Sequence, residues 1–551
     1  MPTPPPTPVS RTPCALGLDF GTASVRAVVV ETQTGRERGA AVVEYPHGVI
    51  DATLPGTGEK LPGDWALQHP GDWVSSIEKA VPQALAAAGV PKEAIVGIGV
   101  DFTACTVLPV DAAGAPLCLS PFWAARPHAW VKLWKHHASQ PQADRINALA
   151  EERGEAFLAD YGGKTSSEWL AAKALQILED DPEVYAAAAA IVEGGDWIVG
   201  QLCGVRVRNS CGAGYKGFWS RARGFPTKEF FGALDPRFAD LGTKLTGEIV
   251  PPGRCVGGLT EPMAGRLGLA PGTAVAAAII DAHSAVPAAT VVQPGRMVMV
   301  MGTSTCHMLL ADRHAKVEGI GGVVQDGIVE GFAGYEAGQP AVGDIFGWFA
   351  KLVAGGSEAG FGELEKQASA APPGGHGLLA LDWWNGNRSI LVDANLSGLL
   401  VGMTLATTAG DIYRALIEAT AFSTRRILDA FEKERIPVTE LIAVGGLAER
   451  SPLLLQIYAD VTRRPIGLAD AVNASALGAA MLGAVAAGPA GGGHASFADA
   501  ARAMARLKPE RVAPEPARAD AYDALYRDWL ELHDHFGRRT DLMKRLRRDR
   551  A

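Results

Sequence analysis

Two short apolar runs in the middle of the chain end in side chains that could carry chemistry. Residues 274–280 lead directly into Asp281, and residues 297–301 lead into Gly302-Thr303-Ser304-Thr305. A short apolar run closed by turn residues is typical of a buried strand. A carboxylate at the end of such a strand lies at the rim of a sheet, where active sites are commonly built. The segment therefore offers a candidate base and, because a Gly-Thr turn exposes N–H groups and hydroxyls, a candidate anion cradle.

A plainer interpretation of the same segment remains open. Asp281 could simply cap the following helix, and the Gly-Thr turn could be an ordinary hairpin. The beginning of the chain repeats the pattern, because an apolar run ends in Asp19 and is followed by Gly21-Thr22-Ala23-Ser24 and a second run. The match between residues 16–31 and 298–312 indicates a duplicated domain. Only the first turn carries the carboxylate, since Val300 occupies the equivalent position of the second.

Four further features lie in glycine-rich or strand-end settings. Asp101 follows the apolar run at residues 94–100. Lys216 lies among aromatic residues in a stretch, 211–219, that we expect to be a loop. Glu336 is the one acid among the small residues 331–343, and small residues let a ligand approach the backbone closely. Gly445-Gly446 separates a strand from a helix, which suits a nucleotide platform.

The elements that must position these residues belong to more than one domain. A chain of 551 residues exceeds what one hydrophobic core usually serves. We expect a disordered proline-rich tail at residues 1–14, a first domain at 15–265 and a second at 266–551, with the glycine- and proline-rich stretch 253–271 as the connection and hinge. The basic C-terminal helical segment is predicted to be a solvated surface.

Composition excludes several classes of function. The net charge of −9 argues against nonspecific nucleic-acid binding, which depends on neutralising phosphates. The seven cysteines are scattered and contain no CxxC pair, which is typical of reduced thiols. The N-terminus lacks the apolar stretch of a secretion signal, and no apolar run is long enough to span a bilayer. We expect a cytoplasmic protein that associates with neither nucleic acid nor membrane.

Read together, these motifs resemble the FGGY carbohydrate kinases of the actin/hexokinase/Hsp70 superfamily. The resemblance covers nearly the whole chain from Ala15 onward and is greatest to the ribulokinase branch, which acts in L-arabinose breakdown. The stretches that carry it are GLDFGTASVRA (17–27), GVDFTACTVLPVD (99–111), KLWKHHA (132–138), YGGKTSSEW (161–169), GYKGFW (214–219), DAHSAVPA (281–288), MGTSTCHMLL (301–310), GYEAGQPAVGD (334–344) and AVGGLAERSP (443–452). One position departs from the family pattern, because Pro340 stands where these kinases commonly carry serine.

The resemblance implies an α/β fold of two ribonuclease-H-like domains with the active site in the cleft between them. It implies transfer of the γ-phosphoryl group of ATP to the terminal hydroxyl of L-ribulose, with Mg²⁺ as the metal. The implied catalytic base is Asp281, and the implied metal ligands are Asp19 and Asp281. The implied sugar-binding residues are Ala104, Lys216, Asp281 and Glu336. The implied ATP-binding residues are Gly21, Thr22, Ser24, Gly302, Thr303, Ser304, Gly445 and Gly446.

The residue types suit this chemistry independently of the resemblance. Phosphoryl transfer to an alcohol needs a metal-bound triphosphate, a positioned hydroxyl, a base and the exclusion of water. No GxxxxGK[ST] motif and no protein-kinase signature occurs. Closure of two domains over the sugar is the expected means of excluding water.

Three alternatives stay open from the sequence. The first is a D-ribulokinase or xylulokinase-type enzyme acting on another pentulose or polyol. The second is an ATP-driven chaperone-like module of the same superfamily, and the third is a catalytically dead homologue. Retention of Asp19 and Asp281 argues against the third, and the charged pair Lys216 and Glu336 suits a small polar ligand better than a peptide. The sequence leaves the oligomeric state undetermined, although a homodimer is possible.

Overall fold

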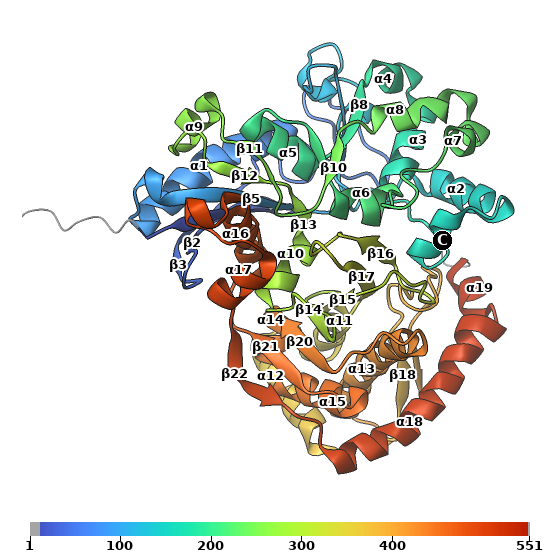
Figure 1. Cartoon of the computed structure of the whole chain (residues 1–551). Coiled ribbons are helices and arrows are strands. Elements are labelled where there is room, and N and C mark those ends of the chain that lie inside the picture. Colours follow the sequence, from blue (N-terminus) through green and yellow to red (C-terminus); the bar gives the residue numbers. More distant parts are fainter. Residues whose placement is uncertain (1–11, 549–551) are drawn as a thin grey trace, which may run out of the picture.

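The computed structural model describes residues 12–548 and is organised around two large mixed sheets (Figure 1). The first has the order β11-β12-β5-β1-β2-β3 with β13 beside β5, and the second has the order β16-β17-β15-β14-β20-β21-β22. The strands of the first sheet are β1 (Cys14–Phe20), β2 (Ser24–Glu31), β3 (Glu37–Glu44), β5 (Ile95–Phe102), β11 (Cys255–Gly258), β12 (Ala274–Ala276) and β13 (Ile279–Ile280). Those of the second are β14 (Arg296–Met301), β15 (Thr305–Ala311), β16 (Gly322–Gln325), β17 (Ala333–Gln339), β20 (Glu440–Val444), β21 (Ile466–Ala469) and β22 (Leu507–Val512).

The two sheets share a local topology. In the first, β1 pairs antiparallel with β2 and parallel with β5. In the second, β14 pairs antiparallel with β15 and parallel with β20. Each Gly-Thr turn therefore joins the two strands of a hairpin whose first strand also begins a parallel array. This repeat agrees with the two-domain α/β prediction made from the internal sequence similarity.

Two helices fill the space between the sheets. Helix α10 (Asp281–Ala288) and helix α16 (Ala474–Ala487) pack in a hydrophobic cluster that also contains Val28 and Val30 of β2 and Val298 of β14. Although α16 comes late in the chain, it lies against the first sheet (Figure 1). The close approach depends on glycine, because a Cβ at Gly17 would lie 2.2 Å from the Ala476 carbonyl oxygen. Asp281 thus begins a helix that both sheets hold in place.

A smaller lobe completes the N-terminal domain. Its four-stranded sheet has the order β4-β7-β6-β8, and its helices pack around a separate hydrophobic cluster. The elements are β4 (Leu67–Gln68), β6 (Val107–Val110), β7 (Val131–Lys132), β8 (Ala190–Glu193), α2 (Gln140–Glu152), α3 (Leu170–Asp180), α4 (Pro182–Ala187), α6 (Ser210–Gly217) and α7 (Lys228–Leu234). Helices α1 (Pro70–Ala88), α5 (Gly194–Cys203) and α9 (Glu261–Leu267) contribute to the core of the first sheet instead. The lobe carries the aromatic residues that surround Lys216.

The stretch 253–271 is not the simple connection that its glycine and proline content suggested. It contains β11, which pairs with β12, and α9, whose Met263 and Leu267 enter the core of the first sheet. Strands β12 and β13 then pair with β5. The first sheet therefore continues beyond residue 265 to Ile280, and the chain passes to the second sheet only between Ile280 and Arg296. Glycine was needed here for turns and close packing and not for a hinge.

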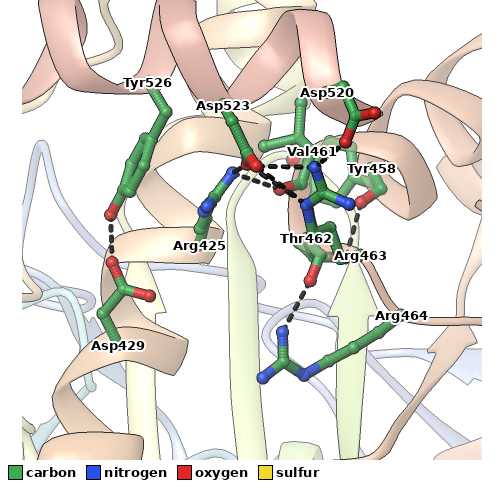
Figure 2. A network of polar contacts seen from close by, with 10 residues as sticks. All are labelled: Arg425, Asp429, Tyr458, Val461, Thr462, Arg463, Arg464, Asp520, Asp523 and Tyr526. Atoms are coloured by element: carbon green, nitrogen blue, oxygen red, sulfur yellow. Dashed lines mark hydrogen bonds and ion pairs between the residues drawn. The ribbon is translucent and has the colours of Figure 1, made fainter. Parts of the chain in front are cut away.

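The C-terminal helices cover the outer face of the second domain. Helix α13 (Ala409–Lys433) and helix α15 (Pro452–Thr462) lie next to the second sheet, and α18 (Pro516–Asp534) packs across them (Figure 1). Figure 2 shows that α18 directs its acids toward arginines of the two inner helices. Asp523 accepts from Arg425 at 2.6 Å and from Arg463 at 2.6 Å, and Tyr526 donates to Asp429 at 2.5 Å. These contacts fix the helices behind the strands that carry the second Gly-Thr turn.

The ends of the chain bear on two expectations. The predicted tail, residues 1–14, falls outside the described residues for its first eleven positions, and Cys14 begins β1. Among residues 12–548, no helix combines the length and apolarity that crossing a membrane requires. The seven cysteines, all within that range, form no disulfide.

Candidate active site

Three carboxylates meet where three neighbouring strands of the first sheet end. Asp19 near the end of β1 is in register with Asp101 near the end of β5, and Asp101 is in turn in register with Ile279 of β13. Asp281 follows β13 directly and begins α10. The carboxyl ends of parallel strands share one edge of a sheet, so the chain brings together acids that are up to 262 positions apart, from Asp19 to Asp281. The structure places Asp19 and Asp281 at the same edge of the sheet, within electrostatic reach of each other.

Asp281 is placed to accept a proton. One carboxylate oxygen accepts a hydrogen bond from the N–H of Ala282 at 2.7 Å, and the side chain is only partly exposed. Burial raises the pKa of Asp281 to about 7, with Asp19 and Glu336 adding to the rise while the Ala282 N–H and Lys216 oppose it. A carboxyl group that titrates near neutral pH suits general acid–base work.

Asp101 was noted at a strand end in the sequence, but it was not assigned to the site. Its side chain is fully buried, and neither carboxylate oxygen has a partner with hydrogen-bond geometry among the described residues. Burial, reinforced by the charges of Asp19 and Asp281, raises the pKa of Asp101 well above its usual range. Its place at the end of an apolar run was visible in the sequence, but its pairing with β1 was not.

Removing the charge of Asp101 should stabilise the protein at alkaline pH. Because its pKa is raised on folding, the folded chain binds a proton that the unfolded chain has lost, so stability falls as pH rises above the unfolded value. We expect Asp101→Asn to raise the free energy of unfolding at pH 8 by more than about 1.4 kcal/mol, the equivalent of one pKa unit. The difference should shrink as the pH approaches 4.

The measurement is thermal unfolding of both proteins in a metal chelator between pH 4 and pH 8. A variant that is no more stable than the wild-type chain at pH 8 would contradict the unpartnered state of Asp101. The chelator matters because a bound cation would offset the repulsion among the three acids.

Asp19 and Asp281 carry oxygen ligands of the kind that Mg²⁺ prefers. Magnesium prefers hard oxygen ligands, holds only one or two protein carboxylates and keeps several waters. Asp19 is held at 3.1 Å by Arg26, which orients its carboxylate at the edge of the site. The residue types at Asp19 and Asp281 therefore suit a magnesium ion that keeps several of its waters.

A buried ion pair joins the two domains next to the acids. The ammonium of Lys216 lies 3.0 and 3.1 Å from the two carboxylate oxygens of Glu336 on β17. Nε2 of His283 on α10 lies 3.2 Å from the same carboxylate, and the ring of Trp169 lies 5.7 Å from the ammonium. Lys216 and Glu336, two of the predicted sugar-binding residues, come from different domains and form this ion pair. His283 and Trp169 were not predicted as site residues, although both lie in motifs that carry the family resemblance.

The electrostatics of this pair favour both charged forms. Burial alone would lower the pKa of Lys216, but Glu336 reverses the sign and raises it. Burial would likewise raise the pKa of Glu336, but Lys216 and His283 hold it well below its usual range. Burial lowers the pKa of His283, which keeps that imidazole neutral at pH 7. The site therefore presents a fixed ammonium and a fixed carboxylate to a ligand.

The segment around Lys216 is a helix and not the loop that we expected. Helix α6 begins after Asn209, whose side chain accepts the N–H of Gly212 at 2.6 Å and caps the helix. Its glycines serve close packing, because a Cβ at Gly214 would lie 2.3 Å from a methyl group of Val324 on β16. The helix anchors Lys216 against the second domain more firmly than a loop would.

The two Gly-Thr turns are the candidate phosphate cradles. In the first, the Gly21 N–H donates to the Ser24 carbonyl at 2.9 Å, and in the second the Gly302 N–H donates to the Ser304 carbonyl at 2.9 Å. The carbonyl of Thr303 accepts the Val342 N–H at 2.8 Å, at the start of helix α11 (Gly343–Ala354). These bonds occupy the carbonyl oxygens. The hydroxyls of Ser24, Thr303 and Ser304 have no hydrogen bond within the described part of the chain, while the Thr22 hydroxyl accepts from Trp134 at 2.9 Å.

Gly445 lies beside the second turn. It follows β20 with φ of 104°, and a Cβ there would lie 2.5 Å from the carbonyl oxygen of Met301, the last residue of β14. Both the conformation and the close approach require glycine. Gly446 begins the short helix α14 (Gly446–Arg450) and is exposed. The predicted platform is therefore adjacent to the Gly302 turn.

The remaining predicted residues lie at the margins. Ala104 follows β5 and is partly exposed where two hydrophobic clusters meet, and no contact places it directly against Lys216 or Asp281. Its neighbour Cys105 lies within electrostatic reach of Lys216. Pro340, the departure from the family pattern, follows the last residue of β17 and precedes α11. It lies where the strand ladder has ended, so its missing N–H costs no strand hydrogen bond.

Comparison with known protein families accounts for most of the chain. The N-terminal domain model of the FGGY family of carbohydrate kinases matches residues 14–287, and the C-terminal domain model of the same family matches residues 297–487.

Relatives that match over nearly the whole chain are described as ribulokinases. A protein from Shouchella clausii described as ribulokinase is 53% identical over 547 residues, covering 97% of this chain and 98% of its own. A ribulokinase from Geobacillus thermodenitrificans is 52% identical over 543 residues, covering 97% and 96%. A ribulokinase from Mycolicibacterium smegmatis is 47% identical over 552 residues, covering 98% and 97%.

Solved structures match the whole fold. The xylulose kinase from Rhodospirillum rubrum superimposes with a TM-score of 0.79 at 26% identity, covering 94% of this chain and 98% of that one. A Plasmodium falciparum glycerol kinase solved with ADP gives a TM-score of 0.75 at 14% identity, covering 95% and 98%. At that identity the second likeness concerns the fold alone.

Proposed function

The chain belongs to the FGGY family of carbohydrate kinases, and from that premise we propose that it is a ribulokinase. It transfers the γ-phosphoryl group of ATP to the terminal hydroxyl of L-ribulose and forms L-ribulose 5-phosphate. The choice of sugar rests on about half the residues being identical to ribulokinases over nearly the whole chain. The observation that carries the chemistry is the meeting of Asp281 with Asp19, Lys216 and Glu336 between the two domains.

Asp281 is the general base of the proposed reaction. Its carboxylate takes the proton of the sugar's terminal hydroxyl as the oxygen attacks the γ-phosphorus of ATP, and the bond from that phosphorus to the bridging oxygen of ADP breaks. The N–H of Ala282 holds the carboxylate in one orientation. Because the pKa of Asp281 is about 7 in the ligand-free protein, a substantial fraction of the carboxylate is ionised at neutral pH.

Lys216 and Glu336 hold the sugar, and the two Gly-Thr turns hold the triphosphate. An ammonium donates to hydroxyl or keto oxygens and a carboxylate accepts from hydroxyls, so the pair can bind a polyol by charge-assisted hydrogen bonds. The exposed hydroxyls of Thr303 and Ser304 donate to phosphate oxygens. When bound between Asp19 and Asp281, Mg²⁺ would neutralise the charge on the phosphates. Gly445 and Gly446 would lie against the adenosine, and Ala104 would border the sugar.

A panel of pentuloses tests the proposal directly. L-ribulose, D-ribulose, L-xylulose and D-xylulose are supplied separately with MgATP, and ADP release is followed by a coupled assay. We expect kcat/KM to be highest for L-ribulose. A preference for D-ribulose or a xylulose would replace the substrate but keep the kinase. ATP turnover that responds to unfolded peptide and not to any sugar would overturn the kinase proposal.

Substitution of Gly445 should affect ATP more than the sugar. We expect Gly445→Ala to raise the KM for ATP at least about tenfold, because a methyl group meets the Met301 carbonyl and the left-handed backbone costs an alanine about 1–2 kcal/mol. Steady-state titration of ATP at saturating L-ribulose measures the effect. Gly347→Ala on α11, where a Cβ has open space, is the matched control and should leave both KM values unchanged. An unchanged KM for ATP in Gly445→Ala would remove Gly445 from the nucleotide site.

The proposed activity also bears on where the protein works and which partners it needs. A kinase that draws on ATP for a catabolic sugar works in the cytoplasm. The partner that the site requires is a small ketopentose, and a homodimer stays a prediction that size-exclusion chromatography with light scattering would decide.

A further inference from the structure

Arg388 is a cation of the second domain that has no partner of its own. Its side chain is exposed and makes no hydrogen bond or ion pair with any residue that the structure describes. The backbone beneath it is nevertheless fixed. Asn387 and Asp393 exchange backbone hydrogen bonds of 2.9 and 2.8 Å, and the Ser389 hydroxyl accepts the Gly338 N–H at 3.2 Å. A rigid base that carries a free guanidinium is typical of a ligand-binding position.

The Arg388 side chain crosses the strand that carries Glu336. A Cβ built on Gly338 would lie 3.3 Å from Cδ and 3.5 Å from Nη1 of Arg388. Gly338 is two residues beyond Glu336 on β17, so the two positions share one face of the sheet. Cys306 of β15 stands directly opposite Gly338 in the antiparallel register. The missing side chain at Gly338 therefore opens a path along which Arg388 reaches the face that bears Glu336.

The charges around Arg388 come from both domains. Although Arg388 is exposed to solvent, the atoms packed around its guanidinium partly desolvate it, which would lower its pKa, but Glu168 of the N-terminal domain, together with Cys306 and Glu336, raises it. The thiol of Cys306 is in turn within electrostatic reach of Glu336, Arg388, Lys216 and Asp281. Arg388 and the proposed base thus have Glu336 and Cys306 as common neighbours.

Glu168 of the N-terminal domain acts on Arg388 through its negative charge. Its side chain is 24% exposed, and its nearest ionic partner is Nδ1 of His137 at 3.8 Å. Its neighbour Trp169 packs beneath Lys216. Among the described residues, no ion pair within 4.0 Å joins Glu168 to Arg388.

We propose that Arg388 binds the sugar directly, with its guanidinium donating to the C1 hydroxyl and the C2 keto oxygen of the ketopentose, and that the charge of Glu168 orients Arg388. This inference rests on the proposed function, because it assumes a ketose whose terminal alcohol faces Asp281. A guanidinium presents parallel N–H donors in a fixed fork, which matches two adjacent oxygens. Placing such a fork beyond Lys216 and Glu336 gives the keto end of the sugar a recognition element of its own.

The first test separates sugar binding from nucleotide binding. Arg388→Met should raise the KM for L-ribulose about 10- to 100-fold, the usual effect of losing hydrogen bonds from a charged donor. The KM for ATP should change less than about twofold, and Tm should hardly change because Arg388 has no partner to lose. Arg388→Lys keeps the charge without the fork and should fall between the two. An unchanged sugar KM, or an equal rise in both KM values, would overturn the proposal.

A substrate analogue locates the contact on the sugar. With 1-deoxy-L-ribulose, which lacks the C1 hydroxyl, the wild-type protein should lose kcat/KM about tenfold or more, whereas Arg388→Met should be nearly indifferent to the missing hydroxyl. Equal losses in the two proteins would contradict the assigned contact. Arg502→Met, which removes an arginine whose side chain is 75% exposed on α17 (Phe497–Met504), is the control and should keep the sugar KM.

The role of Glu168 is tested by a double-mutant cycle. Glu168→Gln should raise the sugar KM by a smaller factor than Arg388→Met, and the double variant should be no worse than Arg388→Met alone. Multiplicative effects would overturn the positioning role of Glu168. The same experiments separate a wrong role for Arg388 from a wrong choice of activity or sugar. Wild-type turnover on the pentulose panel decides the function, and the variants are compared with the wild type on whichever pentulose the panel selects.

Discussion

Replacing Asp281 with asparagine is expected to lower kcat about 100- to 10,000-fold while leaving L-ribulose affinity within about threefold of the wild type. Asparagine keeps the shape of the side chain and can still accept the Ala282 N–H, but it cannot take a proton. The affinity should survive because Lys216 and Glu336, which hold the sugar, are unchanged. Single-turnover kinetics gives the chemical rate, and calorimetric titration of L-ribulose gives the affinity.

The pH dependence provides the control for this assignment. Protonated Asp281 is inactive as a base, so the wild-type kcat/KM for L-ribulose should fall as pH drops below about 7, by up to tenfold per pH unit. A cation bound nearby would move this limb to lower pH, because positive charge favours the carboxylate. The residual rate of Asp281→Asn should lack the limb. Near-normal turnover in that variant would assign the base to another group.

The second large effect concerns the buried ion pair between the domains. Glu336→Gln leaves the ammonium of Lys216 buried without its carboxylate, and we expect a loss of about 3–5 kcal/mol in the free energy of unfolding. The double variant Lys216→Met/Glu336→Gln removes the stranded charge and should recover most of that stability. Both variants should lose sugar affinity, because both lack the Glu336 carboxylate. The stability depends instead on whether the Lys216 ammonium is left buried without a partner. Thermal unfolding and L-ribulose titration on the same samples measure the two quantities.

A matched pair elsewhere in the chain separates these effects. Arg414 and Glu418 on α13 form a second buried ion pair, 2.8 Å apart and with side chains 1% and 2% exposed, and Glu418 also lies 3.0 Å from His376. Glu418→Gln should destabilise the protein by a similar amount but leave the KM for L-ribulose unchanged. Loss of stability without loss of sugar affinity in Glu336→Gln would show that the pair at the domain boundary is structural only.

If Lys216 and Glu336 bind the sugar as proposed, the placement of their ion pair couples sugar binding to domain contact. Lys216 belongs to a helix of the first domain, and Glu336 belongs to a central strand of the second. A sugar that engages both therefore stabilises one relative arrangement of the domains. In the proposed role of Arg388, its charge and that of Glu168 likewise come from different domains, but no ion pair within 4.0 Å joins them among the described residues.

Local pattern was enough to place the strand-end acids and the glycine turns. Asp19 and Asp281 each follow an apolar run, and a run of that kind ends at the rim of a sheet wherever the sheet is built. Gly302 and Gly445 were recognisable because turns leave a local signature in residue type. The duplicated hairpin was visible for the same reason. These features depend on neighbours in sequence, so the sequence by itself determined them.

Tertiary structure alone decided which of these positions meet. Asp101 looked like any strand-end acid until the pairing of β5 with β1 and β13 placed it between Asp19 and Asp281. Glycines around Lys216 suggested a loop, whereas packing against Val324 makes them part of a helix. Arg388 lies in an irregular segment without periodicity, and its side chain passes close to Gly338, where a Cβ would lie 3.3 Å from its Cδ. Such juxtapositions depend on strand order and on the shape of distant neighbours, which no local pattern of residues encodes.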